Sequence, residues 1–121
     1  MNLTQAKALV HRQAKAWEQA DIETVIADFA EDGVFISPGG TWQGHKAIRK
    51  AMSDFFEQAK DVKIEILRVL VDGQQGAIEW RWREFRLTDS QYHSADDAII
   101  FAVNAQNKIV YWREYFDTAN F

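Results

Sequence analysis

Hydrophobic positions in the first half of the chain recur every three or four residues, the spacing that places side chains on one face of an α-helix. The first stripe predicts a helix whose inward residues are Leu3, Ala6, Val10, Ala14 and Trp17, with Asn2 or Thr4 as its cap. A second, shorter helix is predicted after Asp21 and before Gly33, and a third after the segment TWQG. Their inward residues are Ile22, Val25, Ile26 and Phe29 in the second helix and Ala47, Ile48, Ala51, Met52 and Phe55 in the third.

The second half of the chain changes to a period of two, which is typical of β-strands. Four stretches show it: DVKIEILRVLVDG, QGAIEWRWREFRL, SADDAIIFAVNAQ and NKIVYWREYFD. A shorter strand, VFIS at residues 34–37, runs into the turn PGG. Short connections between consecutive strands favour antiparallel hairpins. The order of elements therefore predicts an α+β fold, with three N-terminal helices packed on a curved, mainly antiparallel sheet.

One predicted strand needs cover on both of its faces. The run Ala98–Val103 is apolar at every position, so its outer face is as hydrophobic as its inner face. Helices on one side of the sheet leave the other side open. A homodimer in which two outer sheet faces pack back to back is the simplest arrangement that covers it.

Composition narrows the class of protein. The 121 residues suffice for one domain, residues 1–121, and no linker, repeat or low-complexity segment divides them. A net charge of −4 argues against a nucleic-acid partner, and the apolar runs are too short for a membrane span or a signal peptide. The chain has no cysteine, which excludes disulfides and thiolate sites and fits the reducing cytoplasm as its expected location.

Aromatic residues make up 13% of the chain and include five Trp. In the strand Ile78–Phe85, alternation places Trp80, Trp82 and Glu84 on one face and charged residues on the other. The Trp face is expected to point inward. Two interpretations stay open at this point: the Trp side chains are plain core, or they line a pocket that stacks a flat or hydrophobic ligand.

The closing stretch IVYWREYFD places Glu114 on the same strand face as Trp112 and Phe116. A carboxyl group among aromatic side chains either has a partner across the sheet or faces a cavity. In the second case desolvation raises its pKa, so that it can give or take a proton near neutral pH. Glu114 is therefore the candidate catalytic residue, with its partner still to be identified.

Two further acids, Asp96 and Asp97, precede the apolar run and point to opposite strand faces. Solvation at the end of the strand accounts for both, and a second carboxylate in the pocket is the alternative. Parity alone does not choose between them, and we include Asp96 among the candidate ligand-binding residues.

Other motifs offer little chemistry. His11, His45 and His93 lack the spacing of a metal triad, so no metal site is predicted. The segment GGTWQG lacks the Lys of a phosphate-binding loop and is interpreted as a turn. No motif for a cofactor is present, and any reaction is expected to be cofactor-independent.

Three stretches resemble the SnoaL-like branch of the NTF2-like superfamily: DGVFISPGG, the pattern W-x-G-x-x-A-I at Trp42–Ile48, and KIVYWREYFD. The likeness covers nearly the whole chain. It implies helices and a curved sheet that enclose a cone-shaped pocket, often in a dimer. It implies no single activity, because this fold hosts isomerases, epoxide hydrolases, polyketide cyclases, dehydratases and non-catalytic binding modules.

Compared residue by residue, the resemblance argues against two known mechanisms. Ketosteroid isomerases of the superfamily have an Asp general base before a Pro, where this chain has Ser37 and Pro38. Limonene-epoxide hydrolases use an acid–Arg–acid set, of which Glu114 matches the last-strand acid. Trp80 and Trp82 occupy the positions that match the other two members, so that constellation is incomplete.

The sequence thus predicts a pocket for a small hydrophobic or aromatic molecule, with Glu114 as the proton-transfer group of an isomerase-, cyclase- or hydrolase-like enzyme. The ligand-binding candidates are Trp17, Phe35, Ser37, Trp80, Trp82, Glu84, Asp96, Trp112 and Phe116. The alternative is a non-catalytic ligand-binding or oligomerisation module whose aromatic side chains fill the cone. The volume left inside the cone distinguishes the two hypotheses.

Overall fold

A computed structural model describes residues 1–121 and contains three helices and six strands. The helices are α1 (Leu3–Glu18), α2 (Ile22–Ala27) and α3 (His45–Gln58). The strands are β1 (Phe29–Ser37), β2 (Gly40–Gln43), β3 (Ala59–Asp72), β4 (Gln75–Arg86), β5 (Gln91–Val103) and β6 (Ile109–Tyr115). No helix combines the length and the apolar character that crossing a membrane requires.

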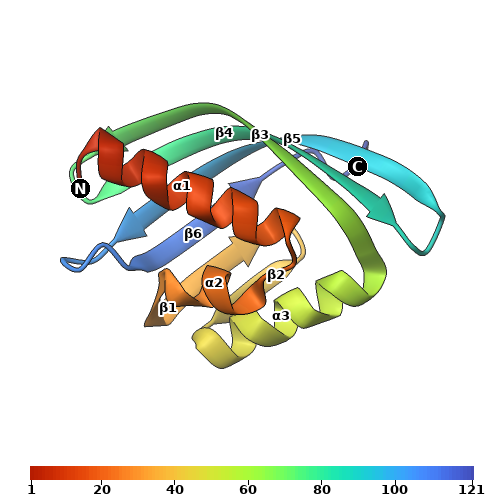
Figure 1. The fold of residues 1–121 in the computed structure, drawn as a ribbon, viewed down its shortest axis with the longest axis horizontal. Helices are drawn as coiled ribbons and strands as arrows, with labels where there is room; N and C mark the ends of the chain where they lie inside the picture. Colours follow the sequence, from red (N-terminus) through yellow and green to blue (C-terminus); the bar gives the residue numbers. More distant parts are fainter.

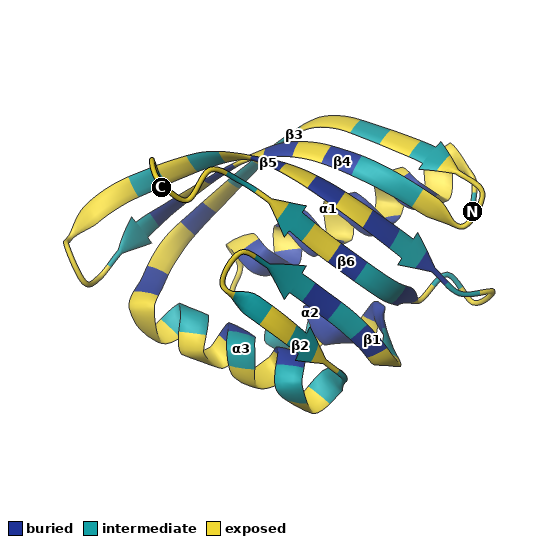
Figure 2. Cartoon of the chain, turned by 180° about the vertical axis from the view of Figure 1, so that it is seen from behind, coloured by how far each residue is buried: buried dark blue, intermediate teal, exposed yellow.

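All six strands form one sheet in the order β2-β1-β6-β5-β4-β3. Only the pair β1 and β6 is parallel, and every other pair of neighbours is antiparallel. The sheet curves over the helices, which gather on one of its faces, while the opposite face has no helix on it (Figures 1 and 2). The predicted α+β fold, with three helices on a mainly antiparallel sheet, is confirmed.

Helix caps follow the sequence closely. Asn2 caps α1: its side chain accepts a hydrogen bond from the Gln5 backbone N–H at 2.8 Å, and the Gln5 side chain accepts one from the Asn2 backbone at 2.9 Å. Asp21 caps α2 through the backbone N–H of Thr24 at 3.2 Å. Both interactions satisfy backbone donors that the first turn of a helix leaves free.

Three strand boundaries differ from the expectation. β1 begins at Phe29 rather than at Val34, and its register against β6 shifts between these two residues. The polar residues in that irregular section break the alternation, which hides the start of the strand from pattern analysis. β2 pairs with β1 where a turn was expected, and β5 begins at Gln91, three residues before the stretch that the sequence indicated.

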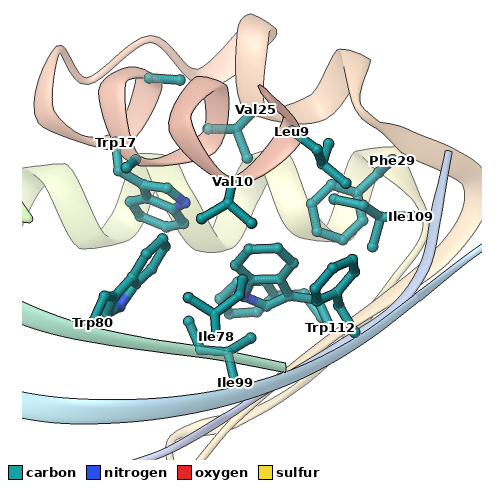
Figure 3. Packing of buried hydrophobic residues seen from close by; sticks show 14 of the residues in the cluster. Leu9, Val10, Trp17, Val25, Phe29, Ile78, Trp80, Ile99, Ile109 and Trp112 are labelled. Atoms are coloured by element: carbon teal, nitrogen blue, oxygen red, sulfur yellow. The ribbon is translucent and has the colours of Figure 1, made fainter. Parts of the chain in front are cut away.

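The core lies between the helices and the inner face of the sheet. Figure 3 shows Leu9, Val10 and Val25 of the helices above Ile78, Ile99 and Trp112 of the strands. Trp80 and Trp112 are completely buried. Leu3 was expected to face inward but is 46% exposed, because the buried stripe of α1 runs instead through Ala6, Leu9, Val10 and Gln13.

Candidate functional site

A cavity of about 150 Å³ opens between α1, α3 and the inner face of the sheet. Most of its wall is aromatic, formed by Trp17, Phe35, Trp42, Phe55, Trp82, Phe116 and Phe121. Ile48, Ala51, Met52 and Ala95 complete the apolar part. The cone is therefore not filled by its aromatic side chains, although the space left is small.

Four polar residues line the cavity: Ser37 at the end of β1, Glu84 on β4, Asp97 on β5 and Glu114 on β6. The register explains why the three acids face the same side. Asp97 is paired with Trp80 of β4, and Glu114 is paired with Ile99, two residues along β5 from Asp97. Residues two apart on a strand share a face, so Asp97 and Glu114 are diagonal neighbours on adjacent strands.

Each cavity carboxyl accepts a hydrogen bond from a tryptophan indole N–H. Trp82 donates to Glu84 at 2.9 Å and Trp112 donates to Glu114 at 3.1 Å, each from two positions earlier on the same strand. Trp80 donates to Asp97 across the β4–β5 pair at 3.0 Å. The tryptophan side chains therefore fix the direction in which these carboxyl groups point.

Glu84 differs from the other two acids because it has a cation. Arg86 Nε lies 3.4 Å from Glu84 Oε2, and the same guanidinium stacks on the Phe121 ring at 4.6 Å from its centroid. Arg86 Nη1 also donates to the Phe121 carbonyl at 3.3 Å. This arrangement holds Phe121 beside Phe116, with ring centroids 5.2 Å apart, at the wall of the cavity.

No cationic side chain contacts Glu114 or Asp97, and their acidity reflects this. Burial away from water, with the nearby charge of Asp97, raises the pKa of Glu114 to about 8, against the opposing hydrogen bond from Trp112. Burial likewise raises the pKa of Asp97 to about 7, with the charge of Asp96 as a smaller cause. The two carboxyls interact, so their protons leave in steps that belong to the pair.

Two buried side-chain polar atoms in the protein have no hydrogen-bond partner, and both belong to residues of this cavity. One is Oδ1 of Asp97, a residue that is only 4% exposed, and the other is the indole nitrogen of Trp17. Unpaired buried polar atoms are rare because each one costs desolvation free energy that no hydrogen bond returns. Their location marks this cavity as the candidate functional site.

The structure places most of the predicted site residues around this cavity. Trp17, Phe35, Ser37, Trp82, Glu84, Glu114 and Phe116 line it. Trp80 and Trp112 do not line it: they lie completely buried in the core and reach the site only by donating their N–H groups. Their prediction as pocket walls was wrong because alternation identifies a face but not the depth of a residue beneath it.

Asp96 is a second correction. It lies on the outer face of the sheet, where its carboxylate forms an ion pair with Arg81 at 2.9 Å, and Asp97 is the acid that enters the cavity. Asp97 shares its parity with Ile99, Phe101 and Val103, all of them buried, whereas Ile100 on the other face is 44% exposed. Sequence analysis also missed Trp42, Phe55 and Phe121, which come from separate elements and meet only in the folded chain.

No group of three or more His, Asp or Glu side chains in residues 1–121 is arranged to hold a metal ion. The three cavity acids are spread over three strands, and each has a tryptophan N–H against it. What the arrangement can do chemically is hold and move protons beside an apolar space.

Comparison with known proteins places the fold. The family model described as SnoaL-like domain matches residues 10–112. None of the curated proteins matches the chain.

Solved structures with similar folds differ in what they do. A hypothetical protein with a ketosteroid isomerase-like fold from Catenulispora acidiphila, in complex with trimethylamine, is 18% identical, with 93% of this chain and 87% of that chain covered and a TM-score of 0.86. A limonene-epoxide-hydrolase-like epoxide hydrolase of M. tuberculosis is 21% identical, with 97% and 86% covered and a TM-score of 0.81. AclR, described as a hydroxylase of Streptomyces galilaeus, is 15% identical, with 98% and 93% covered and a TM-score of 0.82. At these identities the likeness shows the fold alone.

Proposed function

The chain belongs to the SnoaL-like domain family, and we propose that it binds a small, largely apolar molecule in the aromatic cavity and transfers a proton on it with Glu114 and Asp97. The observation that carries this proposal is a pair of buried carboxyls on adjacent strands with no cation between them. A buried acid without a counter-charge weakens the fold, so its retention calls for a use.

The pair suits acid–base chemistry because its members ionise at different pH. Asp97 loses its proton first, and its charge then helps to keep the proton on Glu114. Near neutral pH the pair therefore offers a carboxylate that accepts a proton and a neutral carboxyl that donates one. A bound molecule that touches both can lose a proton at one position and gain a hydrogen bond or a proton at another.

The tryptophan donors give the carboxyl groups fixed directions. Trp80 occupies Oδ2 of Asp97 and Trp112 occupies Oε2 of Glu114, while the second oxygen of each group accepts no hydrogen bond from the protein. Those oxygens are the ones we assign to the ligand. Trp80 and Trp112 are thus positioning residues, since they act through the carboxyls.

The cavity sets the size of the ligand. A volume near 150 Å³ is comparable to an engineered apolar cavity that takes up benzene, so one ring or two fused rings is the expected scale. The trimethylamine found with the Catenulispora protein shows that a similar fold binds a compact organic molecule. A single polar group on the ligand would meet the acids at one end of the cavity.

Ring opening of benzisoxazole tests this proposal without knowledge of the natural substrate. In that reaction a base takes the proton from the ring carbon, the N–O bond breaks, and a nitrile and a phenolate form. Asp97 would accept the proton, and the neutral Glu114 would donate a hydrogen bond to the departing phenolate oxygen. The release of cyanophenol is followed by absorbance as a function of pH.

We expect saturable catalysis that is reduced at least about tenfold by Asp97→Asn and by Glu114→Gln, because general acid–base groups contribute on that order or more. Asp96→Asn is the matched control, since Asp96 is the adjacent residue but faces outward. Catalysis no faster than acetate in solution, or equal in all three variants, would contradict the proposal. Saturable binding of benzisoxazole without turnover would instead favour a non-catalytic binding module.

We further propose that two chains associate through the outer sheet face. Leu70, Ile100 and Tyr115 are exposed by 56%, 44% and 46%, and the first two lie in one row across β3, β4 and β5. Covering such a row would remove apolar surface from water. Sedimentation should show a dimer that Ile100→Glu converts to a monomer, and a monomeric parent protein would refute this assignment.

A further inference from the structure

We propose that the molecule taken by this cavity is a small organic ammonium ion, whose positive charge lies against Asp97 and Glu114 while its alkyl or aryl part packs on the aromatic wall. This inference rests on the proposed function, because it names the chemical class of the ligand for the same cavity. It is carried by the charge balance of the wall, by the orientation of an unpaired oxygen and by the aromatic lining.

The wall of the cavity has acids and no bases. Among the residues that line it are three carboxyl side chains and no Lys, Arg or His. Arg86 stands next to Glu84 alone, and its guanidinium is already engaged by Glu84 and Phe121. Asp97 and Glu114 thus remain the two acids without a positive neighbour, and a cationic guest supplies what the protein does not.

Asp97 has an oxygen available for such a guest. The residue is 4% exposed, its Oδ2 is bound by Trp80, and its Oδ1 has no partner although it lies in the cavity wall. An N–H group of an ammonium ion, or the polarised methyl groups of a quaternary one, would satisfy this oxygen. A neutral hydrocarbon would leave it unpaired, at the full desolvation cost.

The aromatic wall provides the second half of the recognition. Trp17 packs against Phe35, Phe55 and Trp82, with ring centroids 6.1, 5.8 and 5.5 Å apart. The faces of aromatic rings carry negative potential, and clusters of them attract alkylammonium ions in preference to neutral molecules of the same shape. An aromatic cluster beside uncompensated carboxyls therefore fits a cation better than a neutral ligand.

The other charged groups near the site do not reverse this preference. Asp96, behind Asp97 on the outer face, adds negative charge and is balanced by Arg81. His93 lies at the Phe121 ring and is held by Asp89 at 2.6 Å. The parts of α1, α3, β1 and β2 that line the cavity contribute no charged side chain.

Binding of such an ion must be linked to protons. A cation favours the ionised carboxyls, so its uptake releases protons from the pair at a pH where the free site is protonated. The affinity for a permanently charged ammonium ion therefore rises with pH, until both carboxyls are ionised in the free protein. A neutral molecule of equal shape shows no such rise, because ionisation of the acids makes the empty cavity more costly to desolvate.

Choline and its neutral isostere 3,3-dimethylbutanol provide the test. Calorimetric titrations at about pH 6 and about pH 9 bracket the range in which raised carboxyl groups titrate. We expect choline to bind at least about tenfold more tightly at the higher pH, and about tenfold more tightly there than the alcohol. Repeating the titration at the lower pH in two buffers of different ionisation enthalpy should show proton release with choline only.

Glu114→Gln and Asp97→Asn should each weaken choline binding by about tenfold and leave the alcohol unaffected, with Asp96→Asn as the control. Thermal unfolding of each variant verifies that the fold is intact. Equal affinity for choline and the alcohol, or no binding of choline at either pH, would overturn the ammonium assignment. The proposed proton transfer would survive that result, because benzisoxazole ring opening requires no cationic ligand.

Discussion

Two buried aspartates of this protein lie in opposite surroundings. Asp28, at the end of α2, is 7% exposed and receives Arg12 through Nη2 at 2.8 Å and through Nε at 3.1 Å. Gln13 adds a further donor to the same carboxylate at 3.1 Å. Asp97 is as deeply buried, yet it has one indole N–H and an unpaired second oxygen.

The difference separates a structural acid from a functional one. Where a carboxylate joins α1 to α2, the chain supplies a guanidinium and an amide, and every strong acceptor is used. Where carboxyls face the cavity, the chain supplies only tryptophan donors, which orient an acid without neutralising it. Burial alone therefore does not identify a functional acid in this fold, but burial without a cation does.

The largest expected effect is on stability. Asp28→Asn should cost about 2–4 kcal/mol of unfolding free energy, because it leaves Arg12 and Gln13 without the charged acceptor that both share. Asp97→Asn should cost less than about 1 kcal/mol at neutral pH, since no cation loses its partner. Urea denaturation measures both values. Equal costs for the two substitutions would remove the distinction drawn between the two acids.

The second effect is a fall of stability with rising pH. Because the folded pKa of Glu114 lies near 8 and that of Asp97 near 7, the folded state holds protons that the unfolded state has already released. Stability should therefore decline as the pH rises from about 5 to about 8, by on the order of 2 kcal/mol.

The double variant Asp97→Asn, Glu114→Gln should show a nearly flat profile over the same range. Asp28→Asn is a suitable comparison, because it should lower the whole curve without removing the decline. Denaturant titrations at several pH values provide the measurement, and a parent profile that rises with pH would show paired acids instead.

A third effect concerns the coupling between the two cavity acids. Asp97→Asn removes a negative charge that raises the pKa of Glu114, so that pKa should move down toward its usual range while burial still holds it above. Asp96→Asn should change the Glu114 pKa much less, since Asp96 is exposed and paired with Arg81. An NMR titration of the Glu114 carboxyl carbon in each variant decides, and an unchanged pKa in Asp97→Asn would show two independent sites.

The smallest effect belongs to the tryptophan donors. Trp112→Phe removes the N–H that stabilises ionised Glu114 and should raise the pKa of Glu114 further, with a stability cost of about 1–2 kcal/mol. Trp80→Phe should instead act on Asp97. The same NMR titration reports both variants. If each substitution changed both acids alike, a general loosening of the core would explain the result better than loss of one hydrogen bond.

How far the sequence led is clear from particular residues. Alternation along β4 and β6 correctly placed Trp82, Glu84 and Glu114 on the inner face, because a period of two follows directly from strand geometry. The choice between Asp96 and Asp97 required the register of β5, which long-range pairing fixes and local pattern does not. The unpaired state of Glu114 was equally invisible, since it depends on what neighbouring strands present.

Depth and closure were also beyond the sequence. Trp80 and Trp82 share a strand face, yet one is core and the other is cavity wall, because the curved sheet meets α1 and α3 at different heights along β4. Phe121 reaches the cavity only through its contacts with Arg86 and Phe116. Such contacts join residues far apart in the chain, and no periodicity reports them.

The most direct test of the central claim is the pKa of Glu114 in the unaltered protein. Titration of its carboxyl-carbon NMR signal, assigned with Glu114→Gln, should show ionisation near pH 8 rather than near the ordinary value of about 4.3. That result would establish a desolvated acid that keeps its proton at neutral pH. Ionisation at or below the ordinary value would show a compensated carboxylate and contradict the account of this cavity as a site of proton transfer.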